Sequence, residues 1–290
     1  MKGIFTLLLM GCLFVGYSQN PNTRDLVYRT FKDTRVINTQ SVETLPARKL
    51  DIRISHRFGD LFGANGGWGT FYGLENAADV LIGADYGITD NLTIGLNRTK
   101  GAGPLTRLVN TNLKYKILGQ GISSGSPVTL TVLAGSSIAT SKKIDDPELL
   151  TSFPKTAHRF MYNFQVMIGR KFSDRFSLQL TPGFVHRNLV TAADENGLFS
   201  LGLAFRLQVT KVLGIITDAT IPFSSLRTTE RGYYIPLGVG LEIDTGGHVF
   251  QINLTNATGL APADYIPNTR SNWADGQFRM GFTISRLFNL

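Results

Sequence analysis

The feature of this chain that most constrains its fold is a regular alternation of apolar residues with polar or small ones. Between residues 278 and 285, apolar side chains occupy every even position, and polar or small residues occupy every odd one. The same alternation runs through 50–55, 112–117, 160–169, 199–208 and 250–255. Successive side chains of a β-strand point to opposite faces, so the pattern predicts strands with one apolar and one polar face.

The length of these segments separates a membrane barrel from a soluble sandwich. We predict twelve strands, at 49–58, 79–88, 92–99, 107–118, 128–138, 159–171, 176–186, 198–210, 213–222, 233–243, 248–256 and 277–289. Most have about 9–12 residues, the length that a tilted strand needs to cross a hydrocarbon layer. Strands of soluble proteins are usually about 5–6 residues long. The fold class is therefore all-β, a transmembrane antiparallel β-barrel of about 12 strands.

The connections between the predicted strands alternate in length. Those at 89–91, 172–175, 211–212 and 244–247 are short, and those at 59–78, 139–158, 187–197 and 257–276 are long. Bacterial outer-membrane barrels have short periplasmic turns and long extracellular loops. An even strand count then places both ends of the barrel in the periplasm. Ten or fourteen strands stay open, because Pro182, Pro222 and Pro236 lie in or beside strands, where each removes a ladder donor.

The first eighteen residues have the pattern of a secretory signal peptide. Lys2 precedes an apolar stretch from Ile4 to Val15, and 16–18 supplies small residues for cleavage. A lipoprotein signal ending at Cys12 is the alternative. Cys12 is the single cysteine, so a chain cleaved after 18 has no disulfide or thiol chemistry. We divide the chain into a signal peptide at 1–18, an N-terminal segment at 19–47 and an outer-membrane barrel at 48–290.

Residues 19–47 mix basic and apolar side chains without a strand pattern. Arg24, Arg29, Lys32 and Arg35 alternate irregularly with apolar residues. Two interpretations stay open for this segment. It is either a periplasmic tail or a plug that lies in the lumen.

The polar faces of the predicted strands carry charges that would line the lumen. They are Asp51, Arg53, Arg57, Asp85, Lys114, Lys116, Arg206, Asp218, Glu242 and Arg279. Inward charges can line a wet path and bias it toward anions through their summed field. The alternative is a network of ion pairs that fills a narrow lumen.

Aromatic residues of the long loops are candidates for a constriction. Trp68, Phe71 and Tyr72 lie in a glycine-rich stretch, and Trp273 lies in the last long loop. Such a loop can fold inward and narrow the pore. The alternatives are an interfacial anchor, where amphipathic aromatic rings commonly settle, or a site for stacking a sugar.

Several function classes find no candidate residues. Ser55 and His56 are adjacent and so point to opposite faces of their strand, which prevents them from acting as a catalytic pair. The four histidines have no metal-ligand spacing, so we expect no enzyme, metal site or cofactor. The net charge of +8 is spread along the chain without the basic, aromatic cluster of a nucleic-acid site. Outer-membrane lipid and lipopolysaccharide are the expected partners, and they could contact the loop residues Lys142, Lys143, Arg227 and Arg231. The alternative is that these charges are simply solvated.

Two turns connect the pattern to a known family. The turn Thr89-Asp90-Asn91 matches Ser173-Asp174-Arg175 in chemistry, and both are flanked at once by apolar residues. With the alternation, the chain from about 48 onward resembles the porin-like outer-membrane barrels of unknown function found in Bacteroidota. The resemblance implies fold and location and supplies no site residues. The residues favour a passive pore for small hydrophilic, anion-leaning solutes. The alternative is a non-conducting barrel that scaffolds a complex with a periplasmic or cell-surface protein partner.

Overall fold

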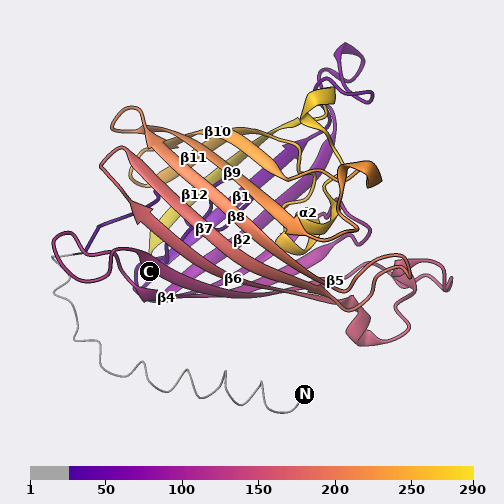
Figure 1. Cartoon of the computed structure of the whole chain (residues 1–290), viewed down its shortest axis with the longest axis horizontal. Helices are drawn as coiled ribbons and strands as arrows, with labels where there is room; N and C mark the ends of the chain where they lie inside the picture. The colour runs from indigo at the N-terminus through magenta and orange to yellow at the C-terminus, as the bar shows by residue number, and fades with distance from the viewer. Residues whose placement is uncertain (1–25) are drawn as a thin grey trace.

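The computed structural model describes residues 26–290, so the predicted signal peptide lies outside the described residues. Twelve antiparallel strands form one closed barrel (Figure 1). The strands are β1 (Lys49–Phe58), β2 (Ala77–Thr89), β3 (Leu92–Thr99), β4 (Leu108–Leu118), β5 (Thr129–Ala139), β6 (Phe160–Lys171), β7 (Phe176–Arg187), β8 (Gly197–Gln208), β9 (Leu213–Phe223), β10 (Leu237–Asp244), β11 (His248–Thr255) and β12 (Arg279–Asn289). The predicted fold class and strand number are confirmed.

Each strand pairs with its neighbours in sequence, and β1 pairs with β12 to close the barrel. Lys49 lies opposite Asn289, so both ends of the barrel wall meet at one end of the barrel. We call it the short-turn end, because four of its five connections are 90–91, 172–175, 209–212 and 245–247. The opposite, long-loop end carries the connections 59–76, 140–159 and 256–278, among others. No helix in the described part of the chain is long and apolar enough to span a membrane.

Two prolines explain where the wall departs from the predicted strands. β10 begins at Leu237, four residues later than predicted, directly after Pro236, which has no N–H to donate to a ladder. Pro182 lies inside β7, and the paired positions of β6 and β7 skip from Gln165–Gly183 to Ile168–Leu180. The ladder is therefore interrupted beside the proline while the strand continues along β8.

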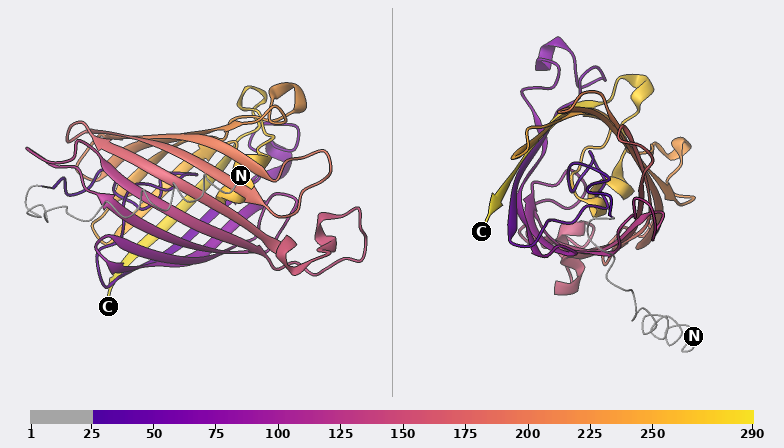
Figure 2. Two further views of the ribbon diagram at one scale, coloured as in Figure 1. Left: turned by 60° about the horizontal axis from the view of Figure 1, so that its bottom comes forward. Right: turned by 90° about the vertical axis from the view of Figure 1, so that its left-hand side faces the viewer.

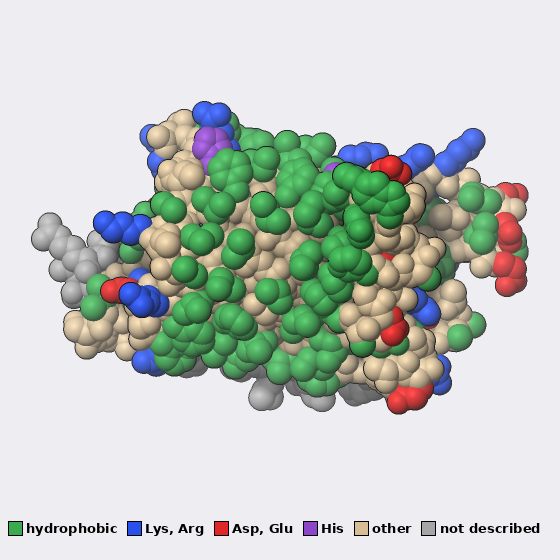
Figure 3. All heavy atoms as spheres, turned by 90° about the horizontal axis from the view of Figure 1, so that it is seen from above, with side chains coloured by type: hydrophobic (Ala, Val, Ile, Leu, Met, Phe, Trp, Pro, Cys, Tyr) green, Lys and Arg blue, Asp and Glu red, His purple; other side chains and the backbone are tan. Residues whose placement is uncertain are grey.

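The outer surface of the barrel is apolar. Outward side chains such as Ile82, Leu96, Phe164, Phe199 and Ile252 are more than half exposed. Figure 3 shows hydrophobic side chains over the middle of the barrel, with Lys, Arg, Asp and Glu gathered toward its two ends. A band of this kind fits the hydrocarbon layer of a membrane, and in water it would be an aggregation hazard.

The interior of the barrel is filled by two segments that are not part of its wall. Residues 26–47, which we call the N-terminal segment, lie within the ring of strands (Figure 2). The β11–β12 loop, residues 256–278, contributes the helix α2 (Pro262–Asn268) from the long-loop end. Each segment has its own buried apolar cluster, and the two clusters share no residue.

Candidate functional site

The lumen is the candidate site, and the N-terminal segment occupies one part of it. The segment starts at the short-turn end, where Val27 donates its N–H to the carbonyl of Gln120 at 2.8 Å. Inside the barrel it reverses direction in a hairpin, in which Arg35 pairs with Gln40 and the N–H of Val36 reaches the carbonyl of Thr39 at 2.9 Å. Most side chains between residues 30 and 45 are buried.

Asp218 on β9 binds the tip of this hairpin. One carboxylate oxygen accepts the backbone N–H groups of Ile37 at 3.1 Å, Asn38 at 2.5 Å and Thr39 at 2.8 Å. The other oxygen accepts the side-chain amide of Asn38 at 2.7 Å. Convergent N–H groups of a turn form an anion-binding concavity, so the hairpin tip and the carboxylate are complementary.

Lys114 and Gln179 hold the returning strand of the hairpin. The Lys114 ammonium donates to the backbone carbonyls of Thr34, Ser41 and Glu43 at 3.0, 3.1 and 3.2 Å. Gln179 accepts the N–H of Val42 at 2.7 Å and donates to the carbonyl of Gln40 at 2.7 Å. The three donor positions of an ammonium are thereby filled, and the amide uses both of its hydrogen-bonding ends.

Two threonines and one arginine of the wall make further polar contacts with the segment. Thr131 donates its hydroxyl to the carbonyl of Val42 at 2.7 Å, and Thr93 accepts the N–H of Leu45 at 2.8 Å. Arg53 lies between two carboxylates, 2.8 Å from an oxygen of Asp33 in the segment and 2.8 Å from one of Asp51 in the wall. These side chains are buried, where charge-assisted hydrogen bonds are stronger than in water.

An apolar strip of the wall lies beneath the same segment. Leu133, Met167, Ala204 and Ile216 belong to four different strands and form one buried cluster with Phe31, Val36, Ile37 and Val42 of the segment. We call these four wall residues the apolar strip. The seat of the segment therefore combines hydrogen-bonding groups with a hydrophobic surface.

Inward glycines allow the segment to lie close to the wall. A Cβ atom at Gly87 would come within 2.1 Å of the carbonyl oxygen of Pro46, which is backbone and cannot rotate away. A Cβ atom at Gly169 would lie 2.8 Å from a methyl carbon of Val42. Only residues without a side chain fit at such close approaches.

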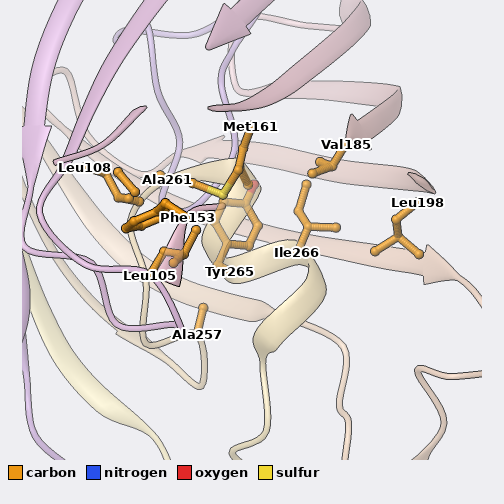
Figure 4. Close-up of a cluster of buried hydrophobic side chains, with 12 residues drawn as sticks. Leu105, Leu108, Phe153, Met161, Val185, Leu198, Ala257, Ala261, Tyr265 and Ile266 are labelled. Atoms are coloured by element: carbon orange, nitrogen blue, oxygen red, sulfur yellow. The ribbon is translucent and has the colours of Figure 1, made fainter. Parts of the chain in front are cut away.

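The long-loop end of the lumen is narrowed by apolar packing. Figure 4 shows Tyr265 and Ile266 of α2 lying among side chains of the wall and the other loops. The buried members of the cluster are Leu105, Leu108, Ala139, Phe153, Met161, Val185, Leu198, Ala257, Ala261, Ala263, Tyr265 and Ile266. The helix is thereby held against the inner wall at β6, β7 and β9.

Two carboxylates and one arginine fasten this loop. Asp79 accepts the N–H groups of Leu260 at 2.8 Å and Gly101 at 2.9 Å. Asp264 accepts the N–H of Ala102 at 2.8 Å, and Arg57 donates to the carbonyls of Ala257, at 3.2 Å, and Gly259. Burial, with a contribution from the charge of Asp79, raises the pKa of Asp264 to about 6.

The ten predicted lumen charges occupy inward positions of the strands, and nine of them are buried. Most contact the two inserted segments: Arg53, Lys114 and Asp218 bind the N-terminal segment, and Arg57 joins Asn38 to the β11–β12 loop. Arg279 donates to Ser271 at 2.7 Å. Lys116 lies 4.0 Å from Glu43 and is partly exposed.

The remaining predicted charges contact other groups of the wall. Arg206 pairs with Glu242 at 2.6 Å, while Asp51 contacts Arg53, and Asp85 lies 3.5 Å from the amide of Asn112. Sequence reasoning missed Gln179, Asp79 and Asp264 as contacts of the inserted segments. The alternation of the strands indicates that Gln179 and Asp79 face inward. Nothing in the neighbouring sequence indicates which groups they contact.

Trp68, Phe71 and Tyr72 lie in the loop that precedes β2, and Trp273 lies in the β11–β12 loop beyond α2. Trp68 is 75% exposed, and its ring contacts Phe71 and Tyr72 edge to face, so these aromatics pack on one another at the surface. Figure 1 shows their loop projecting beyond the long-loop end of the barrel. Trp273 stacks on Phe278, with ring centroids 4.5 Å apart. The narrowing inside the barrel comes from the N-terminal segment and α2 instead.

Little space remains beside the N-terminal segment and α2. A cavity of about 50 Å³ at the short-turn end is bordered by Arg29, Asp33 and Glu43, and one of about 20 Å³ lies beside α2. By this measure a water molecule needs about 10–15 Å³, so these cavities hold a few waters at most. Within residues 26–290, no group of three or more His, Cys, Asp or Glu side chains is arranged to hold a metal ion.

Comparisons with known proteins agree with this architecture. A family model described as "Membrane bound beta barrel domain (DUF5777)" matches residues 31–288. Among solved structures, the chain is similar to the NanC porin, with a TM-score of 0.48 and 8% identity over 83% of this chain and 100% of that one. It is also similar to the KdgM porin, with a TM-score of 0.46 and 10% identity over 83% and 99% of the two chains. An outer membrane channel from Pseudomonas putida F1 gives a TM-score of 0.46 and 13% identity over 85% and 98%. Comparison with curated proteins gave no match.

Proposed function

Because the chain belongs to the family of membrane-bound β-barrel domains (DUF5777) and is an outer-membrane barrel, we propose that it is a gated pore whose gate is its own N-terminal segment. The observation that carries this proposal is the hydrophilic seat of the segment. Asp218, Lys114 and Gln179 bind it through hydrogen bonds that water can replace when the segment leaves. A hydrogen bond between neutral groups contributes only about 0.5–1.5 kcal/mol net for this reason, and one to a charged group about 1.5–3 kcal/mol.

The orientation of the barrel determines on which side of the membrane the N-terminal segment enters the lumen. Short turns of outer-membrane barrels face the periplasm, so the short-turn end, where the segment enters, is proposed to be periplasmic. The long loops and α2 then form the extracellular mouth. A signal that displaces the segment would act from inside the cell envelope.

The solutes of the open pore are proposed to be hydrophilic, with a preference for anions. When the segment leaves, Arg53 loses the carboxylate of Asp33, and Lys114 loses three carbonyl partners. Both cations then face the lumen, where inward positive charge attracts anions. Reversing the charges in Lys114→Glu/Arg206→Glu is expected to weaken this preference.

The experiment is single-channel conductance of a variant that can be locked and released. The double variant Phe31→Glu/Val36→Glu, which we call the weakened variant, places two carboxylates on the apolar strip, where burying an unpaired charge costs several kcal/mol. Into it we would introduce Val42→Cys/Gly169→Cys, with Cys12→Ser to remove the native thiol. An ideal Cβ at Gly169 lies 3.4 Å from the Cβ of Val42, close to the roughly 3.5–4.5 Å of a disulfide.

The gated pore predicts current from the reduced protein and loss of that current on oxidation, reversed by reductant. Single-cysteine versions, which cannot form the bridge, control for oxidation itself. Silence in both redox states, from barrels shown to be folded by their mobility on unheated gels, would contradict the pore. The second candidate, a non-conducting scaffold, would then be favoured, because the apolar packing around α2 also narrows the long-loop end.

A further inference from the structure

We propose that the vacated seat recognises peptide main chain, so that the pore takes peptides as its substrate class. This inference rests on the proposed gating and identifies what the seat binds once the N-terminal segment has left.

The wall contacts the segment mainly through backbone atoms. Asp218 accepts hydrogen bonds from three backbone N–H groups, and Lys114 donates hydrogen bonds to three backbone carbonyls. Gln179 accepts from one N–H and donates to one carbonyl. Thr131 donates to a carbonyl, and Thr93 accepts from an N–H. Every peptide has these groups at every residue other than proline, so such contacts depend weakly on sequence.

Polar side chains of the segment make fewer contacts with the barrel than its backbone does, and they include those of Lys32, Thr34, Glu43 and Thr44. Asp33 pairs with Arg53, and Asn38 contacts Asp218 and Arg57. The side chains of Phe31, Val36, Ile37 and Val42 instead pack on the apolar strip. Main-chain hydrogen bonds that give affinity, beside shallow apolar surface for alternate side chains, are the general pattern of peptide recognition.

The same wall is poorly matched to two other solute classes. Sugars are commonly held on aromatic faces, yet no inward-facing position of the twelve described strands carries an aromatic side chain. A small inorganic anion would meet Lys114 and Arg53 but would make no use of Asp218 or the apolar strip. An amide group matches Gln179 at both ends, because that side chain donates to a carbonyl and accepts from an N–H.

The test measures peptide binding to the weakened variant, whose wall is unchanged. A fluorescently labelled peptide with the sequence of residues 30–45 would be titrated by anisotropy in detergent. A scrambled peptide of the same composition is expected to bind within tenfold of it. A version N-methylated at Asn38 and Val42 keeps every side chain but loses two N–H donors, and is expected to bind at least tenfold more weakly.

A change in the wall provides the matched control. Gln179→Leu in the weakened variant removes one donor and one acceptor that face the peptide backbone, and is expected to lower the affinity about tenfold. Val209→Thr, at an exposed position beyond β8, is expected to leave the affinity unchanged. Both proteins would first be shown to be folded by their mobility on unheated gels.

The outcomes separate this inference from the gated pore. Scrambled peptide binding more than tenfold weaker than the native sequence, or N-methylated peptide binding equally well, overturns main-chain recognition. If the weakened variant conducts current but binds no peptide, the pore proposal stands and the peptide inference is overturned. Peptide binding with the expected selectivity but no current supports the peptide seat and contradicts the pore.

Discussion

The two segments inside the barrel fill its lumen by different chemistry. The N-terminal segment is seated on charged and amide side chains that reach its backbone, above one small apolar strip. The β11–β12 loop is seated on a larger apolar cluster, with Asp79 and Arg57 fastening its backbone. Water replaces hydrogen bonds at little net cost, whereas each large apolar side chain returned to water costs about 1.5–3 kcal/mol.

This difference teaches which of the two segments is suited to move. The N-terminal segment can exchange its polar partners for water, and leaving exposes Phe31, Val36, Ile37, Val42 and the apolar strip, the smaller of the two clusters. The β11–β12 loop would expose Tyr265, Ile266 and the wall residues that cover them. We therefore expect the first segment to open and close, and the second to stay as a fixed narrowing of the mouth.

The largest expected effect is on the β11–β12 loop, the segment that we expect to stay fixed. Tyr265 is 1% exposed at the centre of the apolar cluster, so Tyr265→Ala is expected to destabilise docking of the loop by about 3–5 kcal/mol. Hydrogen exchange of residues 256–268 should rise, while the oxidation rate of the Val42→Cys/Gly169→Cys pair should stay the same. Tyr28→Ala, at an 87% exposed position, is the control. A change in the cysteine oxidation rate would show that the two segments are coupled.

The next effect would unseat the N-terminal segment alone. Asp218→Ala leaves three backbone N–H groups of the hairpin tip without their acceptor, at a cost on the order of 2–3 kcal/mol. We expect the population with the segment displaced to rise about 30- to 150-fold, measured by protease cleavage within residues 30–45. Asp174→Ala, in an exposed turn, should leave cleavage unchanged. Unchanged cleavage in Asp218→Ala would mean that the apolar strip, and not the polar seat, holds the segment.

The pH dependence would sharpen the comparison, because it acts on the β11–β12 loop. Burial raises the pKa of Asp264 to about 6, above its ordinary value of 3.8. The docked loop therefore binds a proton more readily than the undocked loop, and docking is weaker above pH 6 than below pH 4. Between pH 7 and pH 5 we expect docking to strengthen about tenfold, measured by hydrogen exchange of residues 256–268 corrected for intrinsic rates. Asp264→Asn should abolish this dependence, and a loop that loosens toward pH 5 would contradict the assignment.

The sequence predicted the wall well because the wall depends on local information. The two-residue period sets which side chains face the membrane, and most strand bounds follow within about two residues. β10 begins later than predicted because Pro236 and the residues before it belong to the loop that precedes the strand.

The contents of the lumen were harder to predict, because their contacts are distant in sequence. Ile37 and Asp218 are 181 positions apart, and nothing near either residue indicates the other. The segment at 19–47 has no periodicity, so both the tail and the plug stayed open as interpretations. Inward glycines such as Gly87 and Gly169 were the available signal, since they mark close approach of another chain segment. The apolar stretch from Tyr265 to Pro267 is too short to indicate a buried helix.

The smallest expected effect distinguishes local hydrogen bonding from the summed charge of the lumen. Lys114 and Lys116 lie two residues apart on one face of β4, and the sequence placed both in the lumen with the same role. Lys114 is 2% exposed and donates to three carbonyls, whereas Lys116 is partly exposed and lies 4.0 Å from Glu43. An exposed ion pair contributes less than about 1 kcal/mol, so Lys116→Ala is expected to change protease cleavage within residues 30–45 less than about threefold. Lys114→Met, similar in shape, should increase cleavage more. Equal effects of the two substitutions, both suppressed by salt, would show that the field of the lumen holds the segment, and the polar seat would then lose its specificity for backbone atoms.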